Sequence, residues 1–134
     1  MELIFRSEFG INASRPDDAV IYDLAKSVEE FLRSKSYGDL QTFVHVFRVG
    51  MENGFFNPVR QYSRKEDAVS ISTNVETEVY KAIPVQDLKS FVAREMLRAI
   101  LLCSTLRQKP KNFDFERMHS DLDLFLKTEL NVLQ

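Results

Sequence analysis

The chain has 134 residues, a formal net charge of −2 and one cysteine, Cys103. A chain of this length corresponds to one domain and can bury about two-thirds of its unfolded surface in a core. A lone cysteine excludes an intramolecular disulfide and a cysteine-rich zinc site. The near balance of acids and bases disfavours a general nucleic-acid coating protein, which is usually strongly basic. We therefore expect a single domain over residues 1–134.

The longest apolar run lies around residues 99–103. A membrane helix needs about 18 consecutive apolar residues, so we expect no membrane span. The N-terminal residues lack the positive segment and the apolar core of a secretory signal. These features together predict a cytoplasmic protein.

Alternating apolar and polar residues over 3–9 predict a first strand. Apolar residues at helical spacing between Val20 and Leu32 then predict an amphipathic helix of about five turns. Ser14 is the candidate N-cap of this helix, and the segment 37–39 ends it.

The middle of the chain has the period of β-strands. Clear alternation predicts strands over Thr42–Val49 and Val69–Val75. Between them we expect a strand over Phe55–Tyr62, with a hairpin signal at Asn53-Gly54 before it and a polar turn over 64–67 after it. The short connections favour an antiparallel meander, which the N-terminal strand joins.

The last third of the chain returns to helical spacing. Pro84 is predicted in the first turn of a long apolar helix that ends near Leu106. A final amphipathic helix follows within Phe113–Leu130, capped by Asn112 or Asp114. The predicted class is α+β, in the order β-α-β-β-β-α-α, with helices packed on an antiparallel sheet of about four strands.

Two histidines and the cysteine are the candidate catalytic residues. His45 lies beside phenylalanines in a predicted strand, which is typical of a core or cross-strand histidine. Cys103 lies on the apolar stripe of the long helix, where burial makes a thiol inert. Glu116 and His119 stand one turn apart, a spacing found in di-metal sites, but one copy of the pair favours a solvated helix face.

Other catalytic signatures are missing from the sequence. It contains no glycine-rich phosphate loop, no G-x-S-x-G and no H-E-x-x-H. We therefore expect no enzymatic activity, no metal and no cofactor. A small enzyme that uses His45 or His119 remains as an alternative.

The charged residues define two binding hypotheses. Basic residues gather at three places, which supports a nucleic-acid-associated regulatory module as an alternative function: Arg60, Arg64 and Lys65; Arg94 and Arg98; Arg107, Lys109 and Lys111. Acidic residues gather on the first and last predicted helices, which suits docking onto a basic partner. The candidate contacts for such a partner are Asp17, Asp18, Glu29, Glu30, Asp121 and Asp123. Phe55 and Phe56 are a further candidate anchor, although core packing suits them better.

The β-rich segment 42–75, the run Tyr80-Lys-Ala-Ile-Pro84, the apolar helix over 88–106 and the amphipathic stretch 113–130 follow one another along the chain. In this arrangement the chain resembles the immunity proteins of bacterial polymorphic-toxin and contact-dependent growth inhibition systems. The resemblance implies a non-enzymatic protein that binds a cognate toxin tightly and blocks it. Such toxins are often nucleases with basic substrate grooves. The resemblance supplies no catalytic residues and no fixed toxin contacts.

Overall fold

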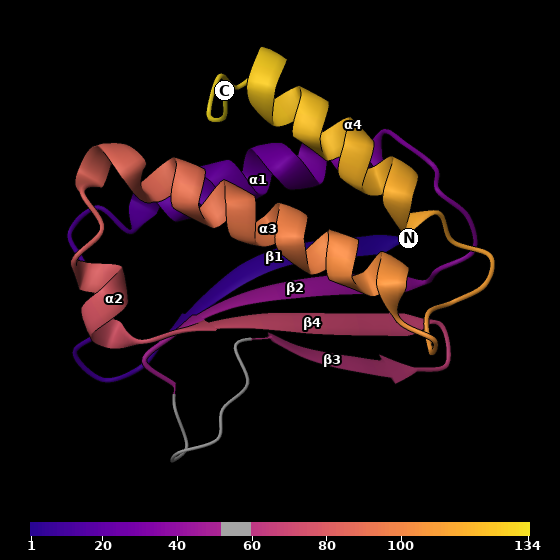
Figure 1. Cartoon of the computed structure of the whole chain (residues 1–134), viewed down its shortest axis with the longest axis horizontal. Helices are drawn as coiled ribbons and strands as arrows, with labels where there is room; N and C mark the ends of the chain where they lie inside the picture. Colours follow the sequence, from indigo (N-terminus) through magenta and orange to yellow (C-terminus); the bar gives the residue numbers. More distant parts are fainter. Residues whose placement is uncertain (52–59) are drawn as a thin grey trace.

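The computed structural model describes residues 1–51 and 60–134. In this part of the chain the elements are β1 (Glu2–Phe9), α1 (Ala19–Arg33), β2 (Thr42–Val49), β3 (Arg60–Lys65), β4 (Ala68–Val75), α2 (Thr77–Lys81), the 3₁₀ helix η1 (Val85–Asp87), α3 (Leu88–Thr105) and α4 (Phe115–Thr128). Figure 1 shows α1, α3 and α4 on one side of the sheet and α2 at one end of it. The predicted Asn53-Gly54 turn and the residues Phe55 and Phe56 lie outside the described residues.

The sheet is mixed, in the order β1-β2-β4-β3. Strands β1, β2 and β4 run parallel to one another, and β3 alone pairs antiparallel, with β4. The α+β class is confirmed, but the predicted antiparallel sheet is wrong. Helix α1 lies between β1 and β2 and returns the chain to the starting end of the sheet, as a parallel crossover requires. Strand β4 then inserts between β2 and β3, so it cannot continue a meander.

The start of α1 differs from the prediction. The helix begins at Ala19 with Asp18 as the preceding residue, and Ser14 lies outside it. Ser14 is therefore not the N-cap. The residues between them form a turn, in which the Asp18 amide donates to the Arg15 carbonyl over 3.2 Å. The Asp18 carboxylate accepts from the Arg15 amide over 2.8 Å, which stabilises this turn.

The hairpin and the segment after it also differ from the prediction. Strand β3 runs to Lys65 because Arg64 and Lys65 pair with Val69 and Ala68 of β4. The predicted turn at 64–67 therefore contracts to two residues. The element order gains the short helix α2 between β4 and α3, which the sequence reading missed.

The core lies between the sheet and the helices. The predicted alternation is confirmed, because side chains from alternate positions of β1, β2 and β4 are buried beneath the helical layer. The largest of these strand side chains are Leu3, Phe43, Phe47 and Ile71. Helix α3 is buried on several sides, since it contacts the sheet, α1 and α4. Among the described residues, no helix has the length and apolar character to cross a bilayer.

The ends of α4 have clear local causes. Asp114 is the N-cap, and its carboxylate accepts from the Arg117 amide over 3.0 Å. At the other end, Asn131 has a φ of 53°, in the left-handed region. The chain reverses there, so that the Val132 amide donates to the Leu126 carbonyl over 2.8 Å. The last residues therefore fold back on the helix.

Two distant connections are joined by a short antiparallel ladder. Gly38, which follows α1, pairs with Phe113, which precedes α4. The Asp39 amide donates to the Asn112 carbonyl over 2.7 Å, and the Asp114 amide donates to the Tyr37 carbonyl over 2.8 Å. Gly38 has a φ of 127°, and a Cβ there would overlap the Asn112 carbonyl oxygen. This contact requires glycine.

We expect Gly38→Ala to lower the free energy of unfolding by about 2 kcal/mol, because the new Cβ both strains the backbone and breaks the ladder. Urea denaturation would measure the change. Ser36→Ala, at an exposed position of the same connection, is the control and should leave stability nearly unchanged. Equal stability of the two variants would contradict the ladder's role.

Candidate functional site

Arg15 is the centre of a polar network that the sequence reading missed. Its Nη1 donates to the Tyr80 carbonyl over 2.8 Å and to the Ile83 carbonyl over 2.7 Å. Its Nε and Nη2 form a two-bond contact with the Asp17 carboxylate, at 2.9 and 2.8 Å. The guanidinium carbon also lies 5.4 Å from the centre of the Tyr80 ring. Arg15 therefore fixes α2 to the β1–α1 connection.

Asp17 and Asp18, two of the predicted contacts for a basic partner, belong to this network. Asp18 is 9% exposed, and its carboxylate accepts from the Tyr80 hydroxyl as well as from the Arg15 amide. Burial, with the neighbouring Asp18 carboxylate, raises the pKa of Tyr80. Both acids already have partners inside the protein, so their first role in the geometry is structural.

Glu29 caps the outer edge of the sheet. Its carboxylate accepts from the Phe5 amide over 3.2 Å, and Arg33 donates to the Leu3 carbonyl over 3.1 Å. Glu29 and Arg33 also form an ion pair of 3.0 Å along α1. These contacts satisfy outward-facing backbone groups of the edge strand β1.

The other three acidic candidates lie closer to solvent. Glu30 is exposed on α1. On α4, Asp121 accepts from the Tyr37 hydroxyl over 2.8 Å, and Asp123 forms a 2.9 Å ion pair with Lys127. Helices α1 and α4 are in contact, and the rings of Phe31 and Phe125 stack with centroids 4.1 Å apart. The structure thus brings together the two helices, and three of the six acids remain at their surface.

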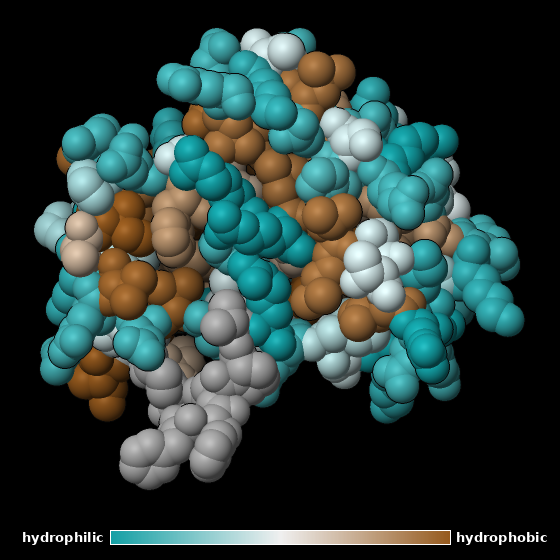
Figure 2. Space-filling view, viewed as in Figure 1, coloured by the Kyte–Doolittle hydropathy of each residue, from teal (hydrophilic) through white to brown (hydrophobic). Residues whose placement is uncertain are grey.

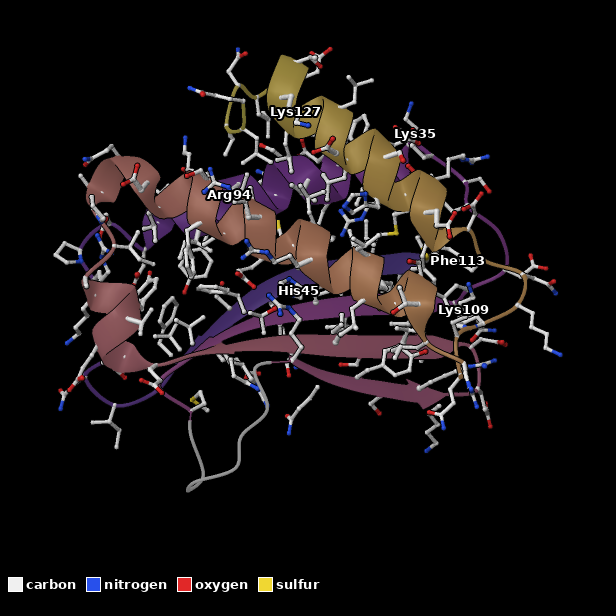
Figure 3. All side chains as sticks on the ribbon, in the orientation of Figure 1. Lys35, His45, Arg94, Lys109, Phe113 and Lys127 are labelled. Atoms are coloured by element: carbon white, nitrogen blue, oxygen red, sulfur yellow. The ribbon has the colours of Figure 1, made fainter. Side chains whose placement is uncertain are left out.

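His45 is buried between the sheet and α3, as Figure 3 shows. Its Nε2 lies 3.0 Å from the Thr73 hydroxyl on the adjacent strand β4. Burial, with the Arg60 guanidinium nearby, lowers the pKa of His45 to about 3. The imidazole is therefore neutral at pH 7, and the reading of His45 as a core histidine is confirmed.

An ion cluster around one buried carboxylate links α3 to β3. Glu95 is 5% exposed and pairs with Arg60 of β3 and with Arg98 one turn along the helix. The contact between Arg98 and Glu95 is 2.6 Å. Two guanidinium groups therefore neutralise one buried carboxylate, which joins β3 to α3.

The remaining catalytic candidates do not converge on one another. Cys103 is fully buried, and burial raises the pKa of its thiol to about 12, so it is a poor nucleophile at neutral pH. Glu116 is exposed and His119 is half-buried on α4. Among residues 1–51 and 60–134, no three side chains of the metal-binding types are grouped to hold an ion.

Two of the three basic groups come together at one end of the sheet. Arg64 donates to the Gln108 carbonyl over 3.0 Å, and the Tyr62 hydroxyl donates to the same oxygen over 3.3 Å. The β3–β4 hairpin therefore lies against the loop that carries Arg107, Lys109 and Lys111. Lys109 itself donates to the Ser104 carbonyl over 2.7 Å. Arg64 and Lys109 are therefore engaged in hydrogen bonds that hold this loop in place.

Shallow depressions lie at both ends of the helical layer. One of about 400 Å³ is lined by Lys109 and Phe113 at the start of α4, and one of about 500 Å³ is lined by Arg94 and Lys127 between α3 and α4 (Figure 3). In the second depression, Lys127 forms an ion pair with Asp123. In the first depression, the Ser104 hydroxyl donates to the Leu101 carbonyl over 2.6 Å, and Lys109 donates to the Ser104 carbonyl.

We expect the stability of the protein to fall by about 2 kcal/mol between pH 7 and pH 5 through His45. The unfolded chain takes up a proton near pH 6.5, whereas the buried imidazole stays neutral down to about pH 3. Stability from this group is therefore complete above pH 6.5 and is lost as the pH falls. Urea denaturation at the two pH values measures the change. His45→Gln, which can keep a hydrogen bond to Thr73, should reduce it, and an unchanged pH dependence would contradict the burial argument.

Comparison with known proteins identifies a family that matches this chain. The chain matches the family described as Immunity protein 44 over residues 1–128. The search of curated proteins and the search of solved structures each gave no match. The family match covers every helix and strand described above, from β1 to the end of α4. The chain therefore belongs to the Immunity protein 44 family.

Proposed function

We propose that this protein neutralises one cognate bacterial toxin by binding to it directly, without catalysing a reaction. Membership of an immunity-protein family is the observation that carries the proposal. His45 and Cys103 support it, since both are buried and held in their neutral forms. This fold therefore suits a binding function better than a catalytic one.

The toxin we expect is a nuclease with a basic substrate groove. An inhibitor of such a toxin needs exposed carboxylates, because complementary charges speed the encounter and fix the orientation of the complex. Glu30 supplies one on α1, whereas Asp121 and Asp123 of α4 are half-buried and already bound to Tyr37 and Lys127. Asp17, Asp18 and Glu29 contribute through the internal contacts that hold these elements in place.

The nucleic-acid alternative rests on the basic residues near β3 and the α3–α4 loop. Two observations weaken it. Arg64 and Lys109 are bound to backbone carbonyls, and exposed Glu66 and Asp67 adjoin the same hairpin. A surface for nucleic acid requires a more continuous positive field.

Co-expression provides the test of the proposed function. The probe is the toxin domain encoded by the reading frame immediately upstream of the gene for this chain. We expect the wild-type chain to restore growth of a bacterial host that produces this domain and to form a one-to-one complex with it by calorimetry. A toxin domain of unrelated sequence is the control and should remain lethal. Absence of both binding and protection would refute the proposal.

A further inference from the structure

Large exposed apolar side chains gather at the end of the molecule that carries α2. Ile11 is 92% exposed, Val79 is 49% exposed and Val85 is 60% exposed, and Met51 at the end of β2 is 40% exposed. Figure 2 shows brown residues on the left-hand side of the molecule, where Figure 1 places α2. Such exposed apolar residues rimmed by charge are typical of protein-binding surfaces.

The segments that carry Ile11 and Met51 are in contact with each other and with the end of β4, which leads into α2. The Gly10 amide donates to the Val49 carbonyl over 2.8 Å, and the Gly50 amide donates to the Val75 carbonyl over 2.9 Å. A Cβ at Gly10 would overlap the Gly50 carbonyl oxygen, so the chain segments after β1 and β2 lie backbone to backbone. We call the four apolar residues on these segments and on α2 and η1 the α2-end surface: Ile11, Met51, Val79 and Val85.

Charge near this surface is mainly negative. Segment 76–87 carries the exposed acids Glu76, Glu78 and Asp87 against one base, Lys81. Within the described part of the chain, none of these three carboxylates forms an ion pair, in contrast to Asp17, Glu29 and Asp123. The carboxylates beside the α2-end surface are therefore available to cations of a partner.

The surface is also held rigidly from within. Arg15 donates to the Tyr80 and Ile83 carbonyls, which lie next to Val79 and close to Val85. The ring centroids of Phe9 and Tyr80 lie 5.7 Å apart, so the segment leading to Ile11 rests on the same support. A surface whose backbone is fixed before binding loses little conformational entropy when a partner docks.

We propose that the α2-end surface is the toxin-docking face, and that it fits a toxin surface with an apolar recess rimmed by lysine and arginine. The inference rests on the proposed function, which it makes specific. In this assignment, burial of Ile11, Val79 and Val85 supplies most of the binding free energy. The charges of Glu76 and Glu78 speed association with the toxin. The acids of α1 and α4 then lie outside the central contact.

Substitutions at exposed positions test this assignment without disturbing the core. Ile11→Glu and Val79→Glu are the test variants, and Leu101→Glu and Leu124→Glu are matched controls at exposed leucines of α3 and α4. The probe is the toxin domain from the upstream reading frame. We expect each test variant to weaken Kd at least tenfold, and each control to stay within about twofold of wild type. Circular dichroism and thermal unfolding should show that all four variants fold as the wild type does.

A second pair of variants tests the charge. Glu78→Lys should slow association with the toxin domain and reduce its dependence on salt, whereas Glu116→Lys, at an exposed position of α4, should change neither. The assignment is overturned if the α2-end variants bind as wild type, or if Leu124→Glu or Glu116→Lys is the variant that loses affinity. It is also overturned if sedimentation shows a dimer of this chain that Ile11→Glu dissociates while toxin affinity is unchanged. Failure of the wild-type chain itself to bind would instead remove the proposed function, and this inference with it.

Discussion

The contacts of Arg15 are the interaction on which one whole end of the molecule depends. The guanidinium is 11% exposed and binds one carboxylate and two carbonyl groups from segments far apart in the sequence. A buried guanidinium is stabilising only when nearly all of its donors have partners, and a helix of five residues cannot persist alone. Each therefore requires the other: α2 supplies acceptors for the charge, and the charge satisfies the carbonyls that end α2.

Internal pairing also decides which acids of the chain can serve recognition. Acids in and just before α1 that look equivalent along the sequence differ in three dimensions. Asp18 is buried against Tyr80 and Glu29 is bound to β1, whereas Glu30 faces solvent. The formal charge of −2 is therefore a poor guide to the field that a partner meets. The field that a partner meets depends on the carboxylates that form no ion pair within the protein.

The limits of the sequence reading follow from the range of the interactions. The strands β1, β2 and β4 and the helices α1, α3 and α4 were predicted, because each shows its own local period over at least seven residues. The direction of the strands was not predicted. Parallel pairing of β2 with β4 depends on where β3 lies, and local alternation carries no information about that position. The polar contacts were missed for a similar reason. Asp18 finds Tyr80 62 positions away and Glu95 finds Arg60 35 positions away, and buried charges leave no periodic signature.

The Glu29–Arg33 pair has a consequence for how this sheet can meet other chains. It occupies the outward-facing groups of Leu3 and Phe5, so the first half of β1 cannot accept another strand. Strand β3, at the opposite edge, has no such cap within the described residues. Growth of stacked strands into a fibre needs two pairing edges on every copy. With the first half of β1 obstructed, the fold disfavours such growth through this part of the sheet edge.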